Sequence, residues 1–285
     1  MSEGTAKRGV GGATGVETSR VSGFAAVNGT RLFYELAGAG PPLVLIHGFT
    51  LDARMWDDQF EQFARNYRVM RYDLRGYGRS AVPSDEVYSH SDDLADLLIY
   101  LNLPPATFIG LSMGGEVAID FALDYPDAVR ALILADAALA GFPWSTDGTT
   151  AQMRSRSRTL GVQAARNAWI SRLTNEYLTM GQPDIAARLG EILSGYSGWH
   201  WLYGDPRRQP DPPAAQQLHR ICVRTLILVG DQDEQDFQEI AALLERQLPD
   251  ARKLVLPGVR HLANMEQPER FAEIVLDFLG QEWRR

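Results

Sequence analysis

Short apolar runs alternate with amphipathic runs along most of the chain. Two alternating segments surround Asn28-Gly29, a dipeptide that favours a β-hairpin. The run PPLVLIHG is apolar and bounded by proline and glycine, which is typical of a strand buried on both faces. Further strands are expected at RVMRYD, ATFIGL, VRALILAD, VRTLILVGD and ARKLVLP, and helices at about 55–65, 91–101, 113–123, 237–247 and 268–283. Strands that alternate with helices imply parallel crossovers, so the pattern predicts an α/β fold with a mostly parallel, eight-stranded sheet flanked by helices.

The alternation stops between about residues 137 and 220. This stretch contains helix-like runs, most clearly at 153–173 and 183–196, and it ends in the proline-rich segment YGDPRRQPDPPAA. Because no strand-like run interrupts it, we expect a helical cap, or lid, inserted between the sixth and seventh strands. The predicted domains are a flexible N-terminal tail rich in Gly, Thr and Ser (1–20), a core domain (21–136 and 221–285) and the cap (137–220).

Composition and charge limit the kinds of partner that we expect for this protein. The chain has 285 residues, a net charge of −8 and a pI of about 5.2, so we expect no nucleic-acid partner. No apolar run approaches the roughly 18 residues that span a bilayer, and the N-terminus lacks the apolar core of a signal peptide. The single cysteine, Cys222, excludes an intrachain disulfide and is expected to be a small buried residue. These features predict a cytoplasmic protein with no membrane partner.

The sequence GLSMGG contains the pattern G-x-S-x-G around Ser112. It follows a strand-like run and opens a helix-like run, as a nucleophile elbow requires. The turn forces the serine into a strained conformation, so its neighbours must lack side chains, and the glycines of this sequence meet that need. The alternative is that Ser112 only caps the helix that begins at Met113. The context favours Ser112 as a catalytic nucleophile.

A serine nucleophile needs a general base. Of the five histidines, His261 follows the last strand, where α/β sheets place their sites, and it is the predicted base. We expect His47 to hold a turn, His90 and His219 to lie on the surface, and His200 to pack in the cap or its pocket.

The base in turn needs an acid that orients it. The segment GDQDEQD after the seventh strand offers several carboxylates, and Asp136 after the sixth strand is a second possible location. We favour Asp233, because the chain needs a short turn beyond Gly230 before it reaches the histidine.

Attack on a carbonyl creates an oxyanion that needs two N–H donors. The backbone of Met113, next to the nucleophile, should supply one donor. The loop after the third strand should supply the other, most simply through the backbone of Phe49.

These motifs together resemble the α/β-hydrolase family, over roughly residues 23–279. The residues that carry the resemblance are His47-Gly48, RYDLRGYGRS, GLSMGG, GDQD and GVRHLANMEQP. RMWDDQ, RYDLRGYGRS and GLSMGG are also similar to the 3-oxoadipate enol-lactonases and to neighbouring cofactor-free esterases and perhydrolases. The resemblance implies a hydrolase of carboxylic esters or lactones that uses no metal or cofactor and works through an acyl-serine. It also implies structural roles for Asp73 and Arg75, and the order Ser112, Asp233, His261 is the family's order.

The same residues are also compatible with other functions. A perhydrolase that passes the acyl group to peroxide, and a hydrolase of carbon–carbon bonds, can use the same triad. A non-catalytic small-molecule receptor can retain it. The aromatic residues of the predicted cap favour a small, largely apolar substrate with one polar end. The predicted substrate-binding residues are Trp144, Trp199, His200 and Trp201. The sequence carries no sign of the oligomeric state.

Overall fold

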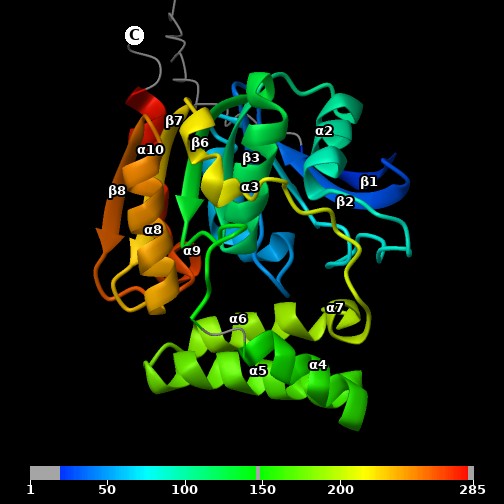
Figure 1. Ribbon diagram of the computed structural model, residues 1–285. Coiled ribbons are helices and arrows are strands. Elements are labelled where there is room, and N and C mark those ends of the chain that lie inside the picture. Colours follow the sequence, from blue (N-terminus) through cyan, green and yellow to red (C-terminus); the bar gives the residue numbers. More distant parts are fainter. Residues whose placement is uncertain (1–19, 146–147, 282–285) are drawn as a thin grey trace, which may run out of the picture.

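The computed structural model describes residues 20–145 and 148–281. Its strands are β1 (Val21–Val27), β2 (Thr30–Ala37), β3 (Pro42–Ile46), β4 (Arg68–Tyr72), β5 (Ala106–Leu111), β6 (Val129–Ala135), β7 (Arg224–Gly230) and β8 (Ala251–Leu256). They form one eight-stranded sheet in the order β1-β2-β4-β3-β5-β6-β7-β8 (Figure 1). Strand β2 is antiparallel to β1 and β4, and the other neighbouring pairs are parallel. The predicted mostly parallel, eight-stranded sheet is confirmed.

Apolar side chains on both faces of the sheet make two cores. In β3, Val44 and Ile46 belong to one core, whereas Leu43 and Leu45 belong to the other. Successive side chains of a strand point to opposite faces, which is why a continuous apolar run marks a strand covered on both sides. The first core includes residues of α2 (His90–Tyr100), α3 (Met113–Asp124) and α8 (Gln235–Gln247), and the second includes residues of α1 (Asp57–Phe63), α9 (Ala263–Glu266) and α10 (Pro268–Gln281).

The stretch between β6 and β7 is helical. It contains α4 (Gly148–Leu160), α5 (Val162–Thr179), α6 (Pro183–Ser194) and α7 (Trp199–Leu202), followed by two short 3-10 turns. Figure 1 shows α4, α5 and α6 as a separate layer below the sheet, at the end toward which the arrows of β6 and β8 point. We call α4–α7 the helical layer. It therefore faces the carboxyl ends of the parallel strands, where α/β sheets place their sites.

A few expectations need correction. The run predicted as one helix over 153–173 is two helices, because the chain breaks at Gly161, whose φ is 86°. Cys222 is exposed, not buried, because it lies in the link before β7 begins. Residues 1–19 of the predicted tail and the end of the last predicted helix lie outside the described residues. Arg20, the last residue of that tail, pairs with Glu35 at 2.7 Å.

Candidate active site

Ser112 occupies a sharp turn between β5 and α3. Its backbone has φ 55° and ψ −120°, a conformation that non-glycine residues rarely adopt and that costs conformational energy. Two backbone hydrogen bonds of 3.0 Å hold it there: Ser112 N–H donates to the Ala135 carbonyl, and Ala138 N–H donates to the Ser112 carbonyl. Ser112 is the N-cap residue of α3, but its side chain makes no capping bond there, so capping does not explain a serine at this position.

The glycines of the GLSMGG sequence make this turn possible. A Cβ atom on Gly110 would lie 2.2 Å from the Gly114 carbonyl oxygen, and one on Gly114 would lie 2.2 Å from the carbonyl oxygen of Ile46. Both atoms would meet rigid backbone, so a side chain at either position would force the strands and α3 apart. Glycine is therefore needed here for close packing and not for an unusual φ.

His261 and Asp233 come together from the loops that follow β8 and β7. His261 Nδ1 lies 2.9 Å from Asp233 Oδ2 and 3.1 Å from Asp233 Oδ1. The Asp233 side chain is buried, whereas 30% of the His261 side chain is exposed. Phe237 packs against the imidazole with its ring centroid 4.2 Å away. A carboxylate on Nδ1 places the N–H on that nitrogen and leaves Nε2 free to accept a proton.

The charges around His261 favour its protonated form. Burial opposes the imidazolium, but the Asp233 carboxylate, through its charge and its hydrogen bond to Nδ1, outweighs burial and raises the pKa of His261 to about 9. Asp136 is the second acid that the sequence offered, and it makes no hydrogen bond to the imidazole in the described structure: its Oδ1 accepts a hydrogen bond from Gly230 N–H at 2.9 Å. Burial and the neighbouring Asp233 raise the pKa of the Asp136 carboxyl well above its usual range. Asp233 is thus the carboxylate placed to orient His261.

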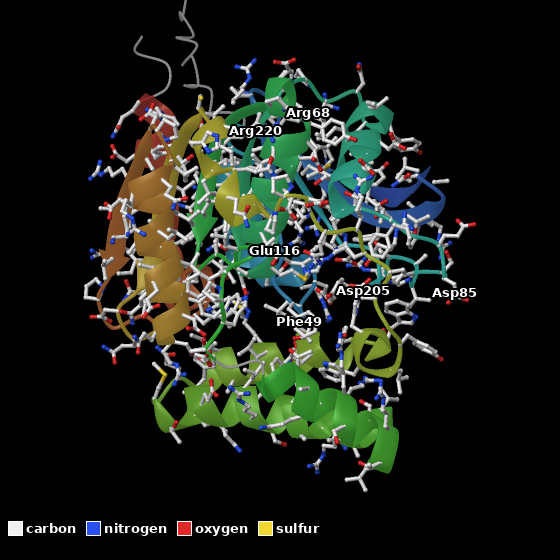
Figure 2. All side chains as sticks on the ribbon, in the orientation of Figure 1. Phe49, Arg68, Asp85, Glu116, Asp205 and Arg220 are labelled. Atoms are coloured by element: carbon white, nitrogen blue, oxygen red, sulfur yellow. The ribbon has the colours of Figure 1, made fainter. Side chains whose placement is uncertain are left out.

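The turn after β3 lies beside Ser112. A Cβ atom on Gly48 would be 3.4 Å from Ser112 Cβ. His47 holds this turn from within, because its Nε2 accepts from Leu74 N–H and its Nδ1 donates to the Gly48 carbonyl, both at 2.9 Å. Burial lowers the pKa of His47, which keeps the ring neutral for this role. Figure 2 shows Phe49 between the sheet and the helical layer, whereas Arg68 and Arg220 lie at the far end of the molecule.

Within the described part of the chain, the backbone N–H groups of Phe49 and Met113 donate to no protein group. Both residues line the same cavity as Ser112. Two free N–H groups beside a serine can stabilise an oxyanion.

Ser112, Asp233 and His261 line one cavity of about 500 Å³ between the strand ends and the helical layer. Of the residues predicted to bind substrate, Trp144 lines this cavity, and His200 lines a smaller neighbouring cavity. Trp201 is buried against Tyr196 at 4.9 Å between ring centroids, and Trp199 packs against Tyr203 instead. Neither Trp199 nor Trp201 lines either cavity.

The structure adds cavity residues that sequence reasoning missed. Besides Trp169, Tyr177 and Phe237, three arginines line the cavity, each with a carboxylate beside it: Arg207 with Glu116 at 2.9 Å, Arg260 with Glu176 at 3.5 Å, and Arg172 with Glu234 at 3.6 Å. Arg260 lies within GVRHLANMEQP, and Glu116 and Glu234 directly follow GLSMGG and GDQD, so these three adjoin motifs. The two members of each pair lie far apart in the chain and meet only in the fold.

His90 also departs from expectation. It is buried, with 5% of its surface exposed, because the start of α2 packs beneath the return segment that carries Arg207. His219 is exposed, as expected. Asp73 accepts hydrogen bonds from Ala53 N–H and Arg79 N–H, and Arg75 pairs with Asp93, in keeping with structural roles.

Among residues 20–145 and 148–281, no group of three or more His, Cys, Asp or Glu side chains is arranged to hold a metal ion. None of the helices that the structure describes is long and apolar enough to cross a membrane.

Comparison with known proteins identifies the family. Residues 41–268 match the α/β hydrolase fold family, and the chain belongs to it. It is 28% identical over 272 residues to the pimeloyl-(acyl-carrier protein) methyl ester esterase of Yersinia enterocolitica, which covers 88% of this chain and 98% of that protein. It is 30% identical over 272 residues to the 2-hydroxy-6-oxononadienedioate/2-hydroxy-6-oxononatrienedioate hydrolase of Paraburkholderia phymatum, covering 88% of this chain and 91% of the relative. The crystal structure of the enol-lactonase from Burkholderia xenovorans LB400 superposes with a TM-score of 0.76 and 25% identity, covering 90% of this chain and 100% of that chain. The chain is therefore an α/β-hydrolase enzyme that resembles esterases and lactonases.

Proposed function

We propose that this enzyme hydrolyses a small carboxylic ester or lactone through an acyl-serine intermediate. The observation that carries the proposal is that Ser112 on its strained turn and His261 held by Asp233 line one cavity. Ser112 is the nucleophile, His261 the general base, and Asp233 the acid that orients the base.

The chemistry follows from these positions. His261 Nε2 takes the proton of the Ser112 hydroxyl as Oγ attacks the ester carbonyl. The oxyanion that forms is stabilised by the backbone N–H groups of Phe49 and Met113, and loss of one such donor typically raises the barrier by about 2.7–4 kcal/mol. His261 then returns the proton to the leaving alkoxide, and the acyl-serine remains. A water molecule repeats the sequence and releases the acid.

In this proposal the helical layer belongs to the cap (residues 137–220). The cap covers the core domain (residues 21–136 and 221–285). Side chains of α5 reach the core through Tyr177, whose hydroxyl donates to Glu266 at 3.1 Å, and through Trp169, which donates to Thr50 at 2.9 Å. These contacts close the cavity on the side away from the sheet, so the acyl-serine would form under the helical layer.

A second function has one specific observation in its favour. The Paraburkholderia phymatum relative is named as the hydrolase of a 2-hydroxy-6-oxo diacid, and it is 30% identical to this chain. Cleavage of a carbon–carbon bond next to a ketone can use the same three residues. Assaying the diacid and a panel of esters separates the two functions, because the ester hydrolase should turn over the esters many times more efficiently.

The direct test uses p-nitrophenyl acetate and p-nitrophenyl butanoate. The wild type should show steady multiple turnovers, and Ser112→Ala should lose about 10⁴-fold or more in kcat. Ser22→Ala, at an exposed serine of β1, is the matched control. A serine-directed phosphonate should label Ser112 and no other serine. Activity of Ser112→Ala within tenfold of the wild type, or a single burst without turnover in the wild type, would refute the proposal.

A further inference from the structure

A smaller cavity of about 190 Å³ adjoins the cavity that contains Ser112. Phe49 and Met113 line both cavities, so the two share a wall at the oxyanion donors. Aromatic rings surround the Phe49 side chain, with Tyr77, Tyr196 and His200 at centroid distances of 6.1, 6.0 and 6.1 Å. If the carbonyl of a substrate lies at Ser112, only this wall separates its reacting end from the second space. We call the second space the side cavity.

His200 lines the side cavity with a buried nitrogen that has no protein partner. Only 4% of its surface is exposed. The imidazole stacks on Tyr77 at a centroid distance of 4.5 Å, and its Nδ1 lies 2.9 Å from the hydroxyl of Tyr196. Its Nε2 makes no hydrogen bond within the described structure. Stacking and the Tyr196 bond fix the ring, so the free nitrogen is held in one place.

His90 lines the same side cavity and is in a similar situation. It is 5% exposed, and its Nδ1 is buried without a partner among the described residues. Burial lowers the pKa of both histidines, that of His200 to about 4, so both rings are neutral at pH 7. Buried polar atoms are nearly always satisfied by protein, water or ligand. Two histidines that line one small cavity, each with an unsatisfied ring nitrogen, indicate that a polar group belongs beside them.

The charges at the side cavity indicate the kind of polar group. Arg154 and Arg207 line it together with Asp205. Arg207 is already paired with Glu116 at 2.9 Å, and Asp205 accepts from Tyr88 and from the backbone of Arg207. Among the described residues, Arg154 donates only to the His200 carbonyl, at 3.4 Å. The two arginines are thus balanced in number by Glu116 and Asp205, and an added carboxylate or phosphate would bring a further negative charge beside Asp205.

We propose that the side cavity binds an uncharged hydrogen-bonding group of the substrate, a ketone or hydroxyl several bonds from the scissile carbonyl, through His200 and His90. A neutral imidazole nitrogen either donates or accepts, so both kinds of group can be satisfied. This inference rests on the proposed ester hydrolase function and specifies its substrate class. His200 and His90 are then residues that determine specificity, and Ser112 and His261 perform the reaction.

Matched methyl esters, followed by acid release at constant pH, test the inference. Methyl 4-oxopentanoate is compared with methyl pentanoate and monomethyl glutarate, and methyl 5-oxohexanoate with methyl hexanoate and monomethyl adipate. At one chain length or both, we expect kcat/KM for the keto ester to exceed that of the plain ester by roughly tenfold or more, and the anionic ester to be the poorest. In His200→Phe, which keeps a ring to stack on Tyr77, the ratio of keto to plain ester should fall toward one. The same substitution at the exposed His219 should leave the ratio unchanged.

The outcomes separate this inference from the proposed function. If the wild type hydrolyses the plain esters in a Ser112-dependent manner but shows no keto preference at either length, the side cavity does not bind such a group. Preference for the anionic esters overturns the choice of an uncharged group. A keto preference that survives both His200→Phe and His90→Phe removes these residues from recognition. If His200→Phe does not fold, the ratio of keto to plain ester in His90→Phe alone tests whether these histidines recognise the group. Failure of every ester together with failure of phosphonate labelling refutes the ester hydrolase itself.

Discussion

The indole Nε1–H of Trp169 donates a hydrogen bond of 2.9 Å to Thr50 Oγ1. This bond joins α5 of the helical layer to the loop that carries Phe49, a proposed oxyanion donor. Thr50 has a φ of 62°, so the loop is held in a conformation that its residues do not favour by themselves. The helical layer therefore supports the geometry of the site in addition to covering it.

Trp169→Phe should lower kcat by roughly 2- to 12-fold, because a net hydrogen bond is worth about 0.5–1.5 kcal/mol and the Phe49 N–H would lose support. Thr50→Val should give a similar loss, and Thr50→Ser, which keeps the hydroxyl, should restore most of the rate. Steady-state kinetics of the three variants and of the Trp169→Phe/Thr50→Val double variant measure the effect. Losses that simply multiply in the double variant would show that the two side chains act independently.

Asp233→Asn should lower kcat by about 10⁴-fold, since an amide leaves the His261 imidazole in the wrong tautomer and its protonated form unsupported. Asp136→Asn should cost far less, because Asp136 hydrogen-bonds to Gly230 and not to His261. Both variants keep the size of the side chain, so thermal unfolding should show folded proteins in each case. Equal losses in the two variants would mean that the acid is wrongly assigned.

The pH dependence should reflect the raised pKa of His261. The base acts only when neutral, so kcat/KM should be low at acidic pH and rise as His261 loses its proton. Because the neighbouring carboxylates raise this pKa to about 9, the midpoint should lie above the ordinary histidine value of 6.5. In the residual activity of Asp233→Asn the midpoint should shift to lower pH. A wild-type rate that is flat from pH 5 to 8 would argue against a histidine base.

Gly114→Ala should destabilise the fold by about 1–3 kcal/mol or more, because the added Cβ would lie 2.2 Å from the backbone oxygen of Ile46. The strand and α3 must separate to admit it, which should also displace Ser112 and reduce kcat. Gly204→Ala is the control, since a Cβ there meets no atom within 4 Å. Denaturant unfolding of both variants measures the difference, and an unchanged midpoint for Gly114→Ala would contradict the close packing described.

Much of the fold could be predicted from the sequence because the patterns that indicate it each span only a few residues. The continuous apolar run of β3, the Asn28-Gly29 turn and the succession of strand, GLSMGG and helix around Ser112 are each recognisable within a few residues of chain. The same holds for the placement of Ser112 and His261 just after strands, since parallel strands bring their carboxyl ends to one edge of the sheet. The proposed nucleophile and base were therefore visible before the structure.

The lining of the cavities was decided by the tertiary structure alone. Trp199 and Trp201 flank His200 in the sequence, yet of the three only His200 lines the cavity that contains Ser112 or the side cavity, because the turn of α7 directs Trp201 into the core. Arg207 meets Glu116 across 91 residues of chain. Such contacts depend on how whole helices pack, and a sequence pattern reports only which face of an element is apolar. The sequence by itself determined the sheet, the turn at Ser112 and the general position of the site, and packing between distant segments determined which side chains face the substrate.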